Sequence, residues 1–163
     1  MRFAAALIAA SLAAAPGWAQ LRTEVPDEIA YRILFQLMRP RKEGAWDEKT
    51  QALWLEQRGI PLRYFIPLRS ASIHYWTAIA PFEADLREIH SRFAGRNDSP
   101  EAAAATRPAR EKISQQLRLV VRDLETELGA EGTPHLRRLI ADIQKETRRA
   151  GAPAGQGGGG HAH

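Results

Sequence analysis

Residues 113–143, ISQQLRLVVRDLETELGAEGTPHLRRLIADI, contain two apolar stripes separated by a short connection rich in glycine. Before Gly129 and again after Pro134, apolar side chains recur at three- and four-residue steps, which is the spacing of one buried face of an α-helix. The connection from Gly129 to Gly132 is too short to lead to a distant element. The stretch therefore predicts an antiparallel helical hairpin over residues 106–149.

The chain before this hairpin also has helical periodicity. It predicts helices over 27–38, over 47–58 with Asp47 as the cap, and over a longer region, 71–94. Pro81 lies inside the last pattern and removes a backbone donor, so we expect the helix to kink or split there. The favoured outcome is a short helix over 71–79 followed by a second helix from Pro81. The predicted fold class is all-α, a small bundle of about five helices that ends in the hairpin.

Composition divides the chain into segments. The aromatic residues that follow position 19 all lie between Tyr31 and Phe93, which indicates an aromatic-rich helical core over 24–95. An alanine-rich linker over 96–107, with room for a loose turn or two, joins this core to the hairpin. The glycine-rich tail, 150–163, has nothing to bury and is expected to be disordered.

The first residues resemble a targeting segment. A charged start at Arg2, an apolar run from Phe3 to Ala15 and small residues at Gly17 and Ala19 are typical of a signal peptide over 1–19. An ordinary N-terminal helix is the less favoured alternative. We therefore expect an exported, soluble protein, periplasmic or secreted, with no transmembrane segment in the mature chain.

Composition also excludes several classes of protein. The chain has no cysteine, which rules out disulfide frameworks, thiolate catalysis and cysteine metal sites. The net charge of +4 comes from basic and acidic residues that are interspersed, and export argues against a nucleic-acid partner, so we expect none.

Residues 60–69, IPLRYFIPLR, repeat the same four residues around Tyr64 and Phe65. The two prolines predict an extended segment or a pair of turns here, with at least one apolar face. One interpretation is a recognition surface; the favoured alternative is a crossing segment whose apolar face lies on the helical core. The candidate partner-binding residues are Ile60, Leu62, Arg63, Tyr64, Phe65, Ile66, Leu68 and Arg69.

His161 and His163 are candidate metal ligands, because two imidazoles suit Cu(II), Ni(II) or Zn(II). Two ligands fall short of a closed zinc set, so incidental tail histidines are the favoured alternative. The sequence has no serine-hydrolase elbow, zinc-protease pair, phosphate loop or dinucleotide fingerprint. It predicts no cofactor.

These observations lead to three functional hypotheses. The first is an exported, non-catalytic binding or accessory protein of the bacterial cell envelope, which acts through an apolar surface on another envelope protein or on itself. The second is metal binding or buffering by the C-terminal His-Ala-His. The third is a small hydrolase whose carboxylates converge from separate helices, since such pairs leave no linear motif.

Overall fold

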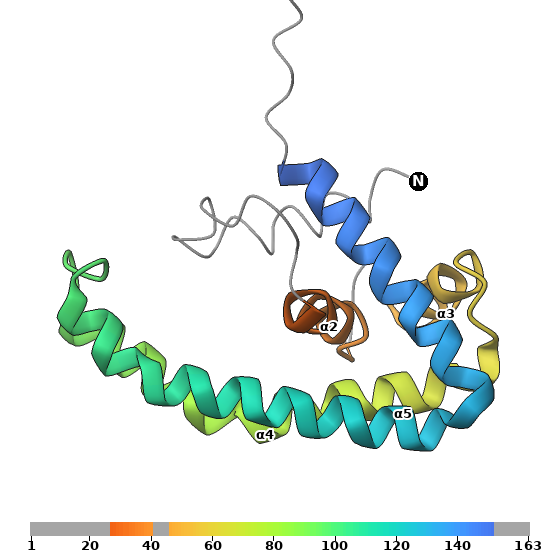
Figure 1. The fold of residues 1–163 in the computed structure, drawn as a ribbon, viewed down its shortest axis with the longest axis horizontal. Helices are drawn as coiled ribbons and strands as arrows, with labels where there is room; N and C mark the ends of the chain where they lie inside the picture. Colours follow the sequence, from red (N-terminus) through yellow and green to blue (C-terminus); the bar gives the residue numbers. More distant parts are fainter. Residues whose placement is uncertain (1–26, 41–45, 152–163) are drawn as a thin grey trace, which may run out of the picture.

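The computed structural model describes residues 27–40 and 46–151, which form an arched fold built from helices (Figure 1). Its elements are α2 (Asp27–Leu37), α3 (Glu48–Glu56), the short 3₁₀ turn η2 (Leu62–Tyr64), α4 (Phe65–Arg92) and α5 (Pro100–Gly151). Within these ranges there is no β-strand, so the all-α fold class is confirmed. None of the described helices is long and apolar enough to cross a membrane.

The first two helices form where the periodicity placed them. The Asp47 carboxylate accepts a hydrogen bond from the Thr50 amide at 2.8 Å, which caps α3 and holds the pKa of Asp47 below its usual value. Side chains near the start of α3 in turn donate hydrogen bonds to the end of α2. Trp46 Nε1 and Gln51 Nε2 donate to the Leu37 carbonyl at 2.6 and 3.0 Å, so a carbonyl at the end of the helix is paired although it is buried.

Aromatic packing joins α2 to α4. The centres of the Phe35 and Tyr75 rings are 5.3 Å apart, and both side chains are fully buried. The Phe35 carbonyl accepts hydrogen bonds from Ser72 Oγ at 2.7 Å and from Trp76 Nε1 at 3.1 Å. Residues of α4 therefore both pack against the Phe35 side chain of α2 and satisfy its backbone carbonyl.

The predicted break of the third helical region is wrong, because α4 runs without interruption across Pro81. Proline costs this helix the hydrogen bond to the Thr77 carbonyl, but Thr77 and Pro81 both lie on the exposed side, where water can satisfy the free group. The start of α4 is also earlier than predicted. Pro67 is the third helical residue, a position whose amide would have no partner within the helix, so it does not hinder the helix. Residues 60–69 are thus a 3₁₀ turn and a helix start, not an extended segment.

The predicted linker also becomes helix. Ser99 Oγ accepts a hydrogen bond from the Ala102 amide at 3.1 Å, and α5 begins at Pro100, a residue well suited to a first helical position. The helix continues past Pro108, which is exposed like Pro81. Most of the segment expected as a linker over 96–107 therefore belongs to α5.

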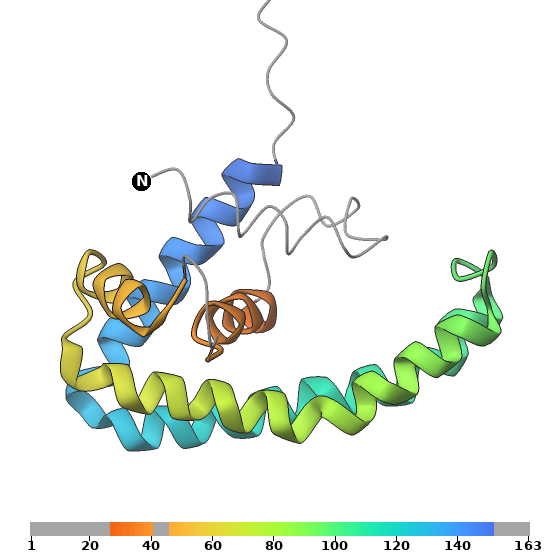
Figure 2. The same ribbon diagram turned by 180° about the vertical axis from the view of Figure 1, so that it is seen from behind.

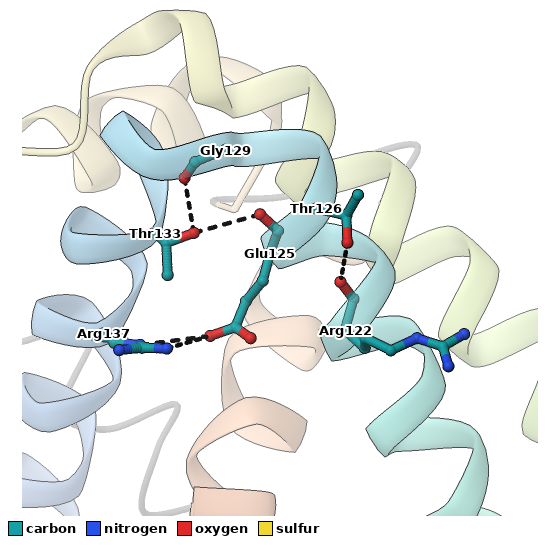
Figure 3. Close-up of polar contacts among 6 residues, drawn as sticks. All are labelled: Arg122, Glu125, Thr126, Gly129, Thr133 and Arg137. Carbon is teal, nitrogen blue, oxygen red and sulfur yellow. Dashed lines mark hydrogen bonds and ion pairs between the residues drawn. The ribbon is translucent and has the colours of Figure 1, made fainter.

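The hairpin connection is a sharp bend within α5, between residues 100–128 and 130–151. Gly129 has φ +65° and ψ −168°, a conformation essentially restricted to glycine. Figure 3 shows how the bend is held: Thr133 Oγ1 donates to the carbonyls of Gly129 and Glu125 at 2.8 and 3.3 Å. Arg137 Nε reaches the Glu125 carboxylate at 3.4 Å from the far side of the bend.

The two segments of α5 diverge from this bend, so they do not form the antiparallel hairpin that was predicted over 106–149 (Figure 1). The antiparallel neighbour of the first segment is α4, as both views show (Figure 2). Lys112 of this segment lies 5.3 Å from the centre of the Phe82 ring of α4. At the bend, Arg63, just before α4, pairs with Glu131 at 3.0 Å.

Helix α2 occupies the angle between the two segments of α5 (Figure 1). Glu28 pairs with Arg118 of the first segment at 2.7 Å, and Asp27 accepts a hydrogen bond from Gln144 of the second segment at 2.5 Å. An aliphatic stripe alone could not predict this arrangement, because both stripes face α2 and α4 rather than each other.

The aromatic residues of α2 to α4 and the aliphatic residues of α5 share one hydrophobic cluster. It extends from Ala30 on α2 to Ile143 on α5 and includes Tyr75 and Leu124. The predicted signal peptide, 1–19, lies outside the described residues, as does the predicted tail beyond Gly151, where α5 ends.

Candidate functional site

The face of η2 and α4 that points away from the core carries exposed apolar residues. Leu62, Ile66 and Ile73 expose 53%, 64% and 47% of their surface. Steps of three and four residues connect them with smaller exposed residues along one side of the helix. We call this face the outer stripe; its members are Leu62, Ile66, Ser70, Ile73, Thr77, Ala80 and Ala84.

The outer stripe carries no charged residue over about six turns of helix. Arg63 and Asp85 flank its two ends. Half-buried Arg69 borders it in between, three residues after Ile66 and four before Ile73. The solvent side of an amphipathic helix is normally polar and charged. A long neutral face with three large apolar side chains is instead typical of a contact surface.

The structure divides the predicted recognition segment between the core and the surface. The buried half lies against the protein's own core, at 2% to 8% exposure: Ile60, Tyr64, Phe65 and Leu68. This half fits the interpretation of a crossing segment. Leu62 and Ile66 face solvent and form the beginning of the outer stripe.

The two arginines of the segment make contacts within the chain. Arg63 donates to the Tyr64 hydroxyl at 2.9 Å and to Glu131 at 3.0 Å, and the first of these contacts does most to raise its pKa. Arg69 pairs with Glu48 on α3, and its guanidinium lies 5.9 Å from the centre of the Phe65 ring. Arg63 remains largely exposed beside the outer stripe, whereas Arg69 is half-buried.

Tyr64 holds the segment against the second part of α5. The centre of its ring lies 5.9 Å from the centre of the His135 ring. A Cβ atom at Gly132 would lie 3.0 Å from the Tyr64 ring and 2.8 Å from the Leu128 Cβ, so the close approach needs glycine. The contact fixes the start of α4 and therefore the direction in which Leu62 and Ile66 point.

Two tyrosines of the core have perturbed acidity. Burial, with a smaller contribution from the carboxylates of Glu125 and Asp27, raises the pKa of Tyr31 to about 12. Burial also raises the pKa of Tyr75. Both side chains lie in the hydrophobic cluster and face its other members, so their shifts reflect packing and not a reactive site.

The predicted metal ligands, His161 and His163, lie outside the described residues. In residues 27–40 and 46–151, no three histidine, aspartate or glutamate side chains converge closely enough to hold a metal ion.

Sequence reasoning missed the second half of the outer stripe. Ile73, Thr77 and Ala80 continue the three- and four-residue spacing begun by Leu62 and Ile66, so the signal was present in the sequence. It was hidden because the two prolines predict an extended segment or a pair of turns over residues 60–69, and Pro81 predicts a break in the helix.

Comparison with known proteins found no match among family models, curated proteins or solved structures. The function is therefore argued from the fold and the outer stripe. The exposure of Leu62, Ile66 and Ile73 on one neutral face is the strongest feature available for this purpose.

Proposed function

We propose that this chain is an exported, non-catalytic binding or accessory protein of the bacterial cell envelope, which docks a protein partner on the outer stripe of α4. The observation that supports the proposal is the exposure of Leu62, Ile66 and Ile73 on one uncharged helix face. A partner with an apolar helix face of its own fits this surface best, because helices pack by interlocking rows of side chains.

The energetics of burial favour occupation of the outer stripe. Fully burying an isoleucine or leucine side chain is worth about 1.5–3 kcal/mol relative to leaving it exposed. Leu62, Ile66 and Ile73 have roughly half of their surface still to bury, so together they supply a few kcal/mol before the costs of association. This amount suits reversible binding.

Sequence features support the proposed location. The charged start, apolar run and small-residue exit over residues 1–19 are typical of export. Export would bring the outer stripe into contact with other envelope proteins.

A photo-crosslinking amino acid at Ile66 tests the proposal in intact cells. Ile66 is 64% exposed, so we expect irradiation to give a discrete crosslinked product whose second component can be identified by mass spectrometry. Leu119 on α5 is the matched control, since it is an exposed apolar residue outside the outer stripe. Phe65 is a second control, because it is adjacent in sequence but buried.

The pattern across the three positions decides the outcome. A product from Ile66 alone supports docking on the outer stripe. Equal products from Ile66 and Leu119 would indicate nonspecific contact, and no product from Ile66 would contradict the proposal.

A further inference from the structure

We infer that the partner on the outer stripe is a second copy of this chain, with the two α4 helices packed antiparallel about Ile73. This inference rests on the proposed function, because it names the partner for the same surface. It depends on how side-chain size and charge are distributed along the outer stripe.

Side-chain size changes from one end of the outer stripe to the other. The large members, Leu62, Ile66 and Ile73, lie toward the start of α4, and the small ones, Ala80 and Ala84, lie toward its end. If Ile73 meets its own copy, an antiparallel pair places each Ile66 opposite Ala80 and each Leu62 opposite Ala84. Large side chains then fill the space above small ones.

A parallel pair would do the opposite. It would bring Ile66 against Ile66 and leave Ala80 facing Ala80, so one end would be crowded while the other end would be left with a gap. Close packing therefore selects the antiparallel arrangement of two identical helices.

Charge selects the same arrangement. The chain has no acidic residue between Gln57 and Glu83, and acidic residues are frequent from Glu83 to the end of α4. An antiparallel pair brings Arg63 of each copy within about 3 Å of the level of Asp85 of the other, on the same flank of the outer stripe. A parallel pair would leave Arg63 at the level of the other Arg63, with no acidic residue near it.

Both Arg63 and Asp85 are free to form an ion pair between two copies. Arg63 is paired with Glu131, but the two side chains are 61% and 80% exposed, so exchanging this partner costs little. Asp85 is exposed, and within the described residues it forms no ion pair.

The free carbonyl of Thr77 also suits this packing. Pro81 leaves it without a helical hydrogen bond on the exposed side of α4. In the antiparallel pair, Ser70 of the other copy lies within one helical turn of this carbonyl, and its hydroxyl can donate to it. Covering the outer stripe therefore need not bury an unpaired polar group.

The size of the contact predicts weak, reversible association. From Leu62 to Ala84 the outer stripe is roughly 30 Å long, but it is only one helix face wide. Such a contact is at the small end of specific interfaces. We therefore expect a dimer fraction that rises with concentration.

Single cysteines test the arrangement directly, because the natural chain has none. Under mild oxidation, Ile73→Cys should form a disulfide-linked dimer with itself. Ile66→Cys and Ala80→Cys should each form no disulfide-linked dimer alone and should crosslink when mixed. Crosslinking of Ile66→Cys with itself would indicate a parallel pair, and Leu119→Cys is the control for random collision.

Charge reversal tests the pairing of Arg63 with Asp85. Sedimentation across a concentration series should show weaker self-association for Arg63→Glu and for Asp85→Arg. An equimolar mixture should recover it, because both opposite-charge contacts are restored in the mixed dimer. Arg122→Glu, on the exposed side of α5, is the control and should behave like the natural chain. A mixture that stays as weak as the single variants would overturn the proposed register.

The failure of this inference differs from the failure of the proposed function. A chain that stays monomeric at every concentration, while the probe at Ile66 captures a different protein, overturns the inference and leaves the binding function standing. A monomeric chain whose Ile66 probe captures nothing overturns both. A crosslinked product that contains two copies of the chain supports both.

Discussion

Helix α4 has two apolar faces, of which only one is covered. On the inner face, Leu68 and Tyr75 are at most 2% exposed and belong to the hydrophobic cluster. On the outer face, Ile66 and Ile73 are chemically similar but are 64% and 47% exposed. The difference comes from the neighbouring elements, because α2 and α5 cover one side of α4 and nothing in the described chain covers the other. Apolar character alone does not distinguish a core from an interface.

Truncation of one residue on each face should give the largest contrast. Leu68→Ala removes a fully buried side chain and should lower the free energy of unfolding by about 2–5 kcal/mol. Ile66→Ala, two residues earlier, should lower it by less than about 1 kcal/mol, since most of that side chain is already in contact with water. Urea unfolding of both variants measures the contrast. Equal losses would mean that the outer stripe is covered in the protein's own fold.

The exclusion of water from the inner side should also make the free energy of unfolding depend on pH in the alkaline range. Tyr31 has a pKa of about 12 in the folded chain against 10.0 for an ordinary tyrosine, so the folded state holds its proton more tightly than the unfolded state does. The resulting stabilisation is fully present below pH 10 and is lost between pH 10 and pH 12. Its upper limit is about 3 kcal/mol, and the raised pKa of Tyr75 acts in the same direction.

Tyr31→Phe isolates this effect. The variant cannot ionise, so its free energy of unfolding should fall less steeply than that of the natural chain as the pH rises above 10. Unfolding curves across this range, with tyrosinate absorbance followed in parallel, give the measurement. Identical pH profiles for the two proteins would show that Tyr31 is in contact with water.

The contact between Tyr64 and Gly132 connects the inner face to the bend of α5. Gly132→Ala places a Cβ 2.8 Å from the Leu128 Cβ and 3.0 Å from the Tyr64 ring, an overlap that should cost about 1–3 kcal/mol. The better helix propensity of alanine offsets this by up to about 1 kcal/mol. A smaller side chain at position 64 should remove much of the penalty.

A double-mutant cycle of thermal unfolding with Gly132→Ala and Tyr64→Leu measures this coupling. We expect Gly132→Ala to cost less in the Tyr64→Leu background. Strictly additive losses would contradict the proposed overlap.

The sequence predicted the helical class and several helix ends well, because these depend on local signals. The Asp47 cap lies at the predicted residue, and the first helix ends at Leu37, one residue before its predicted end. The prolines misled the prediction because their cost depends on location. Pro67 lies where no hydrogen bond is lost, and Pro81 and Pro108 lie on exposed sides where the lost bond is tolerated.

The arrangement of the helices in space could not be predicted from local signals in the sequence. The bend at Gly129 was recognised as a connection, but its angle depends on a backbone conformation and on contacts such as Thr133 to Glu125. Which helix lies beside the first part of α5 depends on long-range packing, and α4 competes for that position with the second part of α5. The outer stripe became visible only when α4 was continuous.

The smallest expected effect on stability is also the most informative about function. Ile73→Glu places a charge at the centre of the outer stripe, where the side chain is half-exposed, so the free energy of unfolding should change by no more than about 0.5–1 kcal/mol. Self-association should be abolished, because an antiparallel pair would bury two like charges at its centre. Leu119→Glu on α5 is the matched control and should leave self-association intact. Thermal unfolding and sedimentation on the same samples separate the two effects. Loss of association in Ile73→Glu with unchanged unfolding would mean that the outer face of α4 contributes to association and not to the stability of the fold. Association equal to that of Leu119→Glu would mean that the two copies make contact elsewhere.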